Sequence, residues 1–355
     1  MRKWLVLSAT TVAVVAISAW AGPALADVDC FDRVTQPYTS VVDSHLHLRP
    51  FGGSGIPLTE MGDYWKRTGV RYVNLYGIGQ TLPVDSTCTY YLDCPGTPVL
   101  PSMKNDFENA HDVLETKIDG VHMTLSMTFP DLANPASIVD SMDLLDSAYP
   151  SEFTWMGEVN LVKQALLNND AEPATLDDIV AWWPFMDELR RRDIPITIHS
   201  DLGNNAEPLK FLYLMEAVLT LYPNNKVVWA HMGLSKELTT MDPALHIDTL
   251  RRLMDQHPNL YLDISWRVLE DTYFSNEAVR DQYVPFLNQY SSRIIPGTDF
   301  VAARKKDFSV YEEELVVTSR INKYLSDKAF RDIALGQSYF DLLGLPDQAP
   351  PMCIA

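Results

Sequence analysis

Positive charge is scarce in this chain. Its 355 residues include 28 lysines and arginines against 47 aspartates and glutamates, which gives a formal net charge of −19 at pH 7. A surface this acidic argues against nucleic acid or an anionic membrane as a partner, because both attract basic proteins. An anionic substrate would need a metal ion or an arginine nearby to offset the repulsion. We therefore expect a small-molecule partner, and the sequence leaves assembly into a homo-oligomer open.

Long hydrophobic runs are also scarce. The clearest one follows two basic residues, extends from Trp4 to Trp20, and is followed by small residues just before Asp27. This pattern predicts a secretory signal peptide over residues 1–26. An uncleaved membrane anchor is the alternative, although the run is short for a membrane span. Cleavage would lower the net charge to −21 and leave residues 27–355 as one domain with no stable membrane anchor. We expect the mature protein to be periplasmic or secreted.

Cysteine is rare, and all four cysteines lie after the predicted cleavage site: Cys30, Cys88, Cys94 and Cys353. None has the C-x-x-C spacing of a zinc ribbon, so we interpret them as structural. An exported protein meets an oxidising compartment, where an even number of cysteines favours disulfides. Four cysteines allow three pairings. Proximity favours Cys88–Cys94, which leaves Cys30–Cys353 to join the two ends of the mature chain.

Eight short apolar segments recur along the rest of the chain, and most are separated by helical patterns. The predicted strands cover residues 41–48, 70–75, 121–129, 153–160, 194–199, 226–231, 260–266 and 293–299. Alternation of this kind predicts parallel strands with helical crossovers. A closed eight-fold barrel needs about 250 residues. The predicted class is therefore α/β, a (β/α)8 TIM barrel with long βα loops.

Three segments between and after the strands have features of their own. Residues 76–102 are rich in proline, threonine and tyrosine and lack periodicity, as is typical of functional or mobile loops. A Cys88–Cys94 ring would stiffen this segment into a flap. A capping box predicts one helix from Thr175 to Arg192, and residues 310–343 are expected to be helical.

Candidate metal ligands lie at the ends of the predicted strands. His45 and His47 alternate along the first strand, so both side chains point to the same face and form a ready pair of ligands; two surface histidines in a turn is the alternative. His199, His231, Glu158 and Asp299 close further strands. Because the carboxyl ends of all barrel strands meet at one mouth, these six side chains are expected to converge.

This series of residues resembles the amidohydrolase superfamily, and more narrowly its amidohydrolase-2 branch, which holds hydrolases and metal-dependent decarboxylases. The resemblance extends from about Val42 to Leu345. It implies that one divalent metal is held by His45, His47, His199 and Asp299, and it favours zinc as that metal. It also implies that His231 lies beside the activated water or the substrate oxygen, and that Asp299 acts as general base. A metal that lowers the pKa of its water, next to a carboxylate that accepts the proton, is coherent hydrolytic chemistry.

The role of Glu158 stays open. The resemblance allows a glutamate on the fourth strand to bridge two metals, whereas an outer position that supports a ligand histidine or the substrate is the alternative. On the substrate side, Trp266 and Arg267 follow the seventh strand and Arg304 follows the eighth. Either arginine could hold a substrate carboxylate, and an ordinary loop salt bridge is the alternative for each.

The leading functional hypothesis is an exported, zinc-dependent hydrolase that cleaves a C–N or C–O bond of a small molecule such as an amide, ester or lactone. A non-oxidative decarboxylase on the same scaffold is the second hypothesis. A barrel that binds a ligand without turnover is the third.

Overall fold

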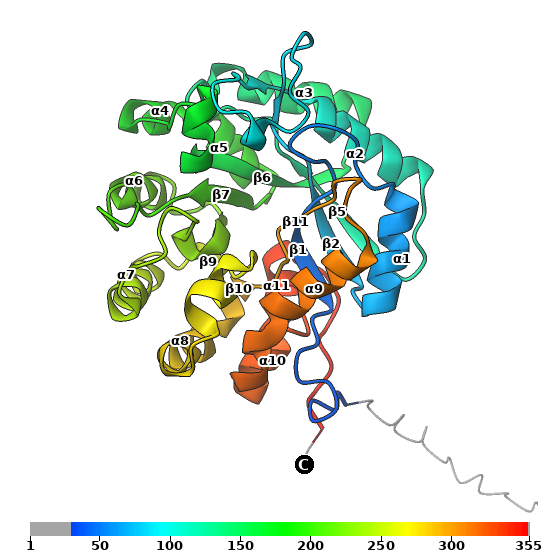
Figure 1. Ribbon diagram of the computed structural model, residues 1–355, viewed down its shortest axis with the longest axis vertical. Helices are drawn as coiled ribbons and strands as arrows, with labels where there is room; N and C mark the ends of the chain where they lie inside the picture. The colour runs from blue at the N-terminus through cyan, green and yellow to red at the C-terminus, as the bar shows by residue number, and fades with distance from the viewer. Residues whose placement is uncertain (1–29, 354–355) are drawn as a thin grey trace, which may run out of the picture.

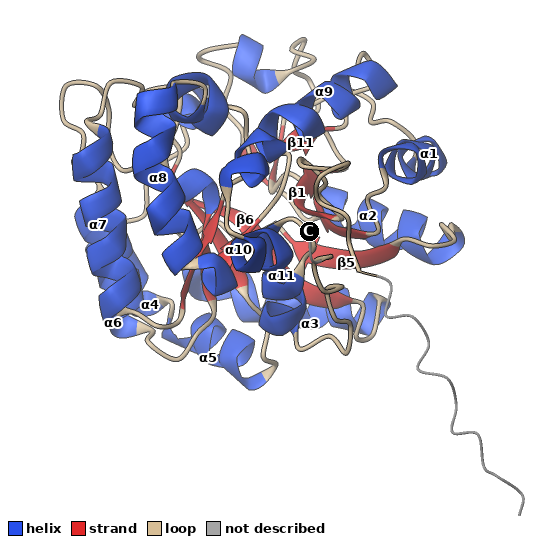
Figure 2. Ribbon diagram, turned by 90° about the horizontal axis from the view of Figure 1, so that it is seen from below, coloured by secondary structure: helices blue, strands red, loops and turns tan. Residues whose placement is uncertain are grey.

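The strands form one continuous parallel sheet that curls into a barrel. The computed structural model describes residues 30–353, so the predicted signal peptide lies outside the described residues. The strands are β1 (Val42–His47), β2 (Tyr72–Tyr76), β5 (His122–Met127), β6 (Phe153–Val162), β7 (Ile196–Ser200), β8 (Val227–Trp229), β9 (Leu260–Asp263), β10 (Ile294–Ile295) and β11 (Phe300–Val301). Their order in the sheet is β10-β9-β8-β7-β6-β5-β2-β1-β11. Helices surround the strands in Figures 1 and 2. The predicted TIM barrel is confirmed.

The eighth strand position is divided, which corrects the prediction of one strand over residues 293–299. β10 pairs with β9 and β11 pairs with β1, so together they link the last strand to the first. Between them, the Ser44 amide donates to the Pro296 carbonyl (3.0 Å) and the Asp299 amide donates to the His45 carbonyl (2.8 Å). A Cβ on Gly297 would lie 2.8 Å from the Cβ of His45, so only glycine permits this close approach.

Helices separate the strands, as the predicted alternation implies. They are α1 (Leu58–Thr68), α2 (Lys104–Glu115), α3 (Ile138–Ala148), α4 (Leu176–Ala181), α5 (Trp183–Arg191), α6 (Leu212–Leu221), α7 (Pro243–Gln256) and α8 (Glu277–Gln289). The helix expected from Thr175 to Arg192 is in fact two helices, because Pro184 in the first turn of α5 lacks the amide proton that a continuous helix needs. Its start is the expected capping box between Thr175 and Asp178. α8 was not predicted, since Pro285 interrupts its pattern although Tyr283, Phe286 and Leu287 are buried.

The end of the chain is helical, as expected, but in separate pieces. α9 (Phe308–Ser319), α10 (Asp327–Ile333) and α11 (Gln337–Leu343) follow the last strand. Cys30 and Cys353 form a disulfide, and Phe31 pairs with Met352 beside it, so the two ends of the described chain lie together. The predicted terminal pairing is confirmed. No helix within residues 30–353 is both long and apolar enough to span a membrane.

The predicted flap follows β2 and is the cyan loop that projects in Figure 1. A short antiparallel pair, β3 (Gln80–Thr81) and β4 (Leu100–Pro101), forms its base. The Cys88–Cys94 disulfide closes its tip, as predicted. Buried Asn169 donates to three flap carbonyl groups, those of Tyr91, Cys94 and Thr97. The flap is therefore fastened to the loop after β6 as well as closed on itself.

Candidate metal centre

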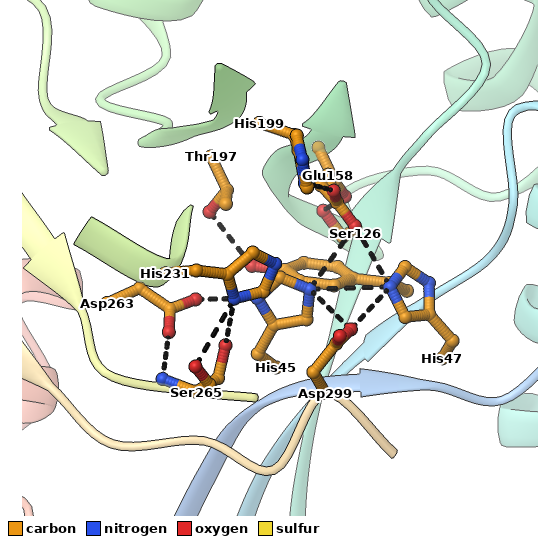
Figure 3. A network of polar contacts seen from close by, with 12 residues as sticks. His45, His47, Ser126, Glu158, Thr197, His199, His231, Asp263, Ser265 and Asp299 are labelled. Carbon is orange, nitrogen blue, oxygen red and sulfur yellow. Dashed lines mark hydrogen bonds and ion pairs between the residues drawn. The ribbon is translucent and has the colours of Figure 1, made fainter. Parts of the chain in front are cut away.

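The two histidines of β1 point into the barrel mouth, where their Nε2 atoms face each other and the carboxylates of Glu158 and Asp299 (Figure 3). His45 Nδ1 lies 2.5 Å from Asp263 Oδ2, and His47 Nδ1 lies 2.7 Å from the Gly77 carbonyl oxygen. Both acceptors require a proton on Nδ1, which leaves the Nε2 lone pair of each ring available. The two Nε2 atoms lie 3.3 Å apart. β1 therefore presents two oriented donor nitrogens to one point.

Two carboxylates face the same point. Oε2 of Glu158 lies 3.0 Å from His47 Nε2 and 3.4 Å from His45 Nε2. Oδ1 of Asp299 lies 3.3 Å and 3.4 Å from the same two atoms. Glu158 reaches this position from β6, where Gly157 has φ 108° and a Cβ would lie 2.2 Å from the Thr197 carbonyl oxygen. Asp299 lies between β10 and β11, in the divided strand.

The chemistry of this donor set fits a divalent cation. Donor atoms of His45, Glu158, His231 and Asp299 all lie within 4.8 Å of one another. Burial alone would lower the pKa of His45, but the neighbouring carboxylates, Asp263 above all, raise it to about 10. The negative charge that favours a proton here equally favours a metal ion in its place. Imidazole nitrogen and carboxylate oxygen are the ligands that zinc takes in catalytic sites.

His231 lies two residues beyond β8, in a turn rather than at the end of the strand itself. His231 and Met232 both have left-handed backbone conformations, with φ 54° and 55°. The side chain of Ser265 lies 3.0 Å from His231 Nδ1, and the ring of Trp266 lies 5.1 Å from the imidazole. Burial lowers the pKa of His231 to about 4. The imidazole is therefore neutral, and one of its nitrogens belongs to the group of converging donor atoms.

His199 adjoins the cluster through a carboxylate. Its Nδ1 lies 2.5 Å from Glu158 Oε1, and its Nε2 lies 2.9 Å from Asp201 Oδ1. The four-residue group of converging donor atoms contains His231 and does not contain His199. The expectation that His199 is a direct metal ligand stays a prediction.

Two residues at the centre were not assigned a role from the sequence. The ammonium group of Lys163 lies 2.9 Å from Glu158 Oε1, with 14% of the side chain exposed. The negative charge of Glu158 offsets the effect of burial and raises the pKa of Lys163. Asp263 is buried and contacts both His45 and the Ser265 amide. The predicted seventh strand extended through Trp266, which hid Asp263 in its interior; β9 in fact ends at Asp263.

The substrate-side candidates lie in different places. A cavity of about 600 Å³ reaches Asp299 and His199 and is lined by Trp266 and Arg267. Arg267 also pairs with acidic side chains, including Asp271 at 2.8 Å. Arg304 is 58% exposed and pairs with Glu60, on α1. Trp266 and Arg267 thus line the cavity at the site, whereas Arg304 forms a salt bridge on the surface.

Comparison with known proteins places this arrangement in context. Residues 155–331 match the family model described as amidohydrolase. Among solved structures, the chain is similar to dihydroorotase from Campylobacter jejuni (TM-score 0.53, 14% identity, 87% of this chain and 84% of that chain). It is also similar to a zinc-bound amidohydrolase from Burkholderia multivorans (TM-score 0.55, 13% identity, 86% of this chain and 100% of that chain). A third similar structure is a probable 2-pyrone-4,6-dicarboxylic acid hydrolase from Acinetobacter baumannii (TM-score 0.50, 11% identity, 86% of this chain and 99% of that chain). No curated protein matches the chain.

Proposed function

Since the chain belongs to the amidohydrolase family and is a metal-dependent hydrolase, we propose that it cleaves a C–N or C–O bond of a small molecule, such as an amide, ester or lactone. The observation that carries this proposal is the convergence of two oriented imidazole nitrogens and two carboxylate oxygens at the barrel mouth. The adjoining cavity gives a substrate access to that point. A donor set with an accessible side is what a catalytic metal site requires, because water and substrate must reach the metal.

We propose zinc as the metal and one metal ion per chain. His45, His47, Glu158 and Asp299 would hold it, because each histidine Nε2 lies 3.0–3.4 Å from an oxygen of both carboxylates. A donor atom of His231 lies within 4.8 Å of those of His45, Glu158 and Asp299, so His231 would lie next to the metal. A single ion is supported by Lys163, because its ammonium group already neutralises the second oxygen of Glu158, which a bridge to another metal would need. A zinc ion is bound in the similar Burkholderia multivorans structure.

The residues around the metal have complementary roles in the proposed reaction. When bound, the metal lowers the pKa of a coordinated water from 15.7 to about 7. Burial alone would raise the pKa of Asp299, but its contact with His47 and the other nearby histidines lower it, so Asp299 is an ionised base. Asp299 accepts the proton of the attacking water and passes it to the leaving nitrogen or oxygen. His231 Nδ1 lies 3.0 Å from the Ser265 hydroxyl oxygen and 3.3 Å from the Ser265 carbonyl oxygen. In the tautomer whose Nδ1 accepts from the hydroxyl group, neutral His231 carries its proton on Nε2 and can donate it to the substrate oxygen.

Metal analysis and isotope labelling of the purified protein test this function. We expect about one zinc per chain, loss of activity on chelation and recovery when zinc is restored. In ¹⁸O-labelled water, a panel of amides, esters and lactones should give product that carries the label, with no release of carbon dioxide. Turnover of a carboxylated substrate with release of carbon dioxide would contradict hydrolysis and favour the decarboxylase. A zinc-loaded protein inert on all these panels would favour a ligand-binding barrel.

We also propose that the protein is exported. Two disulfides support an oxidising compartment, and the apolar run of the first 26 residues supports a cleaved signal peptide. N-terminal sequencing of the protein recovered outside the cytoplasm should begin at Asp27. An intact N-terminus on the exported protein would contradict cleavage.

A further inference from the structure

The cavity beside the metal centre carries lysines that have no carboxylate partner. Lys236 and Lys306 both line it. Within residues 30–353, neither lysine forms an ion pair with a carboxylate, although the chain has a large excess of acidic residues. Arg267 differs from them, because it pairs with Asp271 and Glu314 from the same cavity wall. The ammonium groups of the two lysines are therefore free of a direct carboxylate contact, in a cavity whose lining also includes acidic residues.

These positive charges are close enough to affect one another. Burial lowers the pKa of Lys306, the charges of Glu314 and Asp299 oppose that shift, and the charges of Lys305 and Lys236 lower the pKa by smaller amounts. Like charges repel one another, and a bound anion relieves the repulsion. Glu237 also lines the cavity, next to Lys236 in sequence.

The walls of the cavity are largely aromatic and apolar. Its lining includes Phe51, Tyr90, Leu92, Trp266, Val268, Phe300 and Val301. The ammonium group of Lys236 lies 5.7 Å from the centre of the Trp266 ring, and that of Lys306 lies 4.7 Å from the centre of the Phe300 ring. Cation–π contacts of this kind hold a lysine near an aromatic face while leaving its N–H groups free to donate.

We propose that Lys236 and Lys306 bind the anionic group of the substrate, which is a small carboxylate with an apolar body. This inference rests on the proposed function, because it describes the substrate of the same site. The apolar body packs against Trp266 and Phe300, and the carboxylate accepts hydrogen bonds from the two ammonium groups. The scissile bond then extends toward Asp299, which lines the same cavity.

Calorimetric titration of the full-length, metal-loaded protein with benzoate tests the proposal. Benzamide is the matched neutral probe, since it has the same ring and nearly the same shape. We expect benzoate to bind about tenfold more tightly than benzamide at low salt, and the difference to shrink as salt screens the charges. Equal binding of the two probes would overturn the proposal.

Lysine variants separate this site from the metal, which can also attract a carboxylate. K236Q should weaken benzoate binding about threefold and K306Q, whose lysine is more buried, about tenfold, with benzamide binding unchanged. K117Q is the control, because exposed Lys117 precedes β5 at the opposite end of the barrel and its loss changes the net charge equally. Benzoate binding that is the same in wild type, K236Q and K306Q would overturn the assignment.

A third probe and the hydrolysis panel distinguish the remaining outcomes. Tighter, lysine-dependent binding of phenyl phosphate than of benzoate would overturn the carboxylate and identify a phosphate-bearing substrate. Lysine-dependent benzoate binding in a protein that hydrolyses nothing would contradict the proposed function alone. Hydrolysis accompanied by lysine-independent binding would contradict this inference alone.

Discussion

Asp263 provides the most direct test of how the metal centre is held together. Its Oδ2 lies 2.5 Å from His45 Nδ1 and its Oδ1 lies 2.5 Å from the Ser265 amide nitrogen. The carboxylate therefore accepts from two buried N–H groups, and it fixes which nitrogen of His45 is free. We expect D263N to weaken zinc binding although Asp263 does not face the metal.

The loss of zinc affinity depends on how many of the two acceptor oxygens of Asp263 the substitution removes. Asparagine has one oxygen for two donors, so whichever way its amide turns, an NH₂ group faces either His45 or Ser265. Loss of an outer partner of a ligand histidine typically weakens metal binding 10- to 100-fold, or about 1.4–2.7 kcal/mol. D263N should lie near the lower end, since one contact survives, and D263A near the upper end.

Competition with a zinc-chelating dye measures the zinc dissociation constant of each variant. D332N is the matched control, because Asp332 is also buried and also accepts from a serine, Ser291, but lies on α10. Its thermal stability should fall while its zinc affinity stays at the wild-type value. A zinc affinity of D263N within twofold of wild type would refute the argument that Asp263 orients His45.

Three further predictions concern other parts of the molecule. E158Q should abolish zinc binding and not merely halve it, because Lys163 leaves one oxygen of Glu158 for a single metal; elemental analysis gives the stoichiometry. Burial lowers the pKa of His246 to about 4 from 6.5, so the unfolded chain binds more protons between these values and stability falls as pH falls. From pH 7 to pH 5, H246Q should lose about 2 kcal/mol less unfolding free energy than wild type. Replacing Cys30 and Cys353 (the Cys30 pair) with serines should lower the free energy of unfolding by at most about 6 kcal/mol. Replacing Cys88 and Cys94 (the Cys88 pair) should lower it by about 2 kcal/mol, and denaturant unfolding measures both.

Each of these predictions has a result that contradicts it. An E158Q protein that keeps one of two zinc ions would show that Glu158 bridges two metals. Equal pH dependence of wild type and H246Q would mean that His246 does not carry the acid sensitivity. The disulfide ranking fails if loss of the Cys88 pair destabilises the fold more than loss of the Cys30 pair. Loss of the Cys88 pair should instead raise KM, because Tyr90 and Leu92 of its ring line the cavity.

The barrel and most of the metal centre could be predicted because each relevant residue has a local signal. His45 and His47 share a face through the two-residue period of a strand, and Glu158 and Asp299 follow apolar runs. Lys163 had no such signal: β6 continues to Val162, two residues beyond its predicted end, and so places Lys163 next to Glu158.

The remaining differences depend on contacts between distant segments. Arg304 pairs with Glu60, a partner far away in sequence that only the folded barrel brings near. α8 was missed because Pro285 is a helix breaker by propensity, whereas the burial of Phe286 and Leu287 stabilises the helix around it. Propensity and spacing report local preferences, so tertiary contacts of this kind escape them.

The divided last strand has a consequence for the order of events during biosynthesis. Asp43 and Thr298, which hydrogen-bond across the barrel seam, are 255 residues apart in sequence. A nascent chain thus has the two histidines of β1 long before it has Asp299, and the complete set of donors exists only once the barrel has closed. For a chain that crosses a membrane unfolded, zinc would be loaded on the far side. The metal available in that compartment, rather than in the cytoplasm, would then decide which ion the enzyme carries.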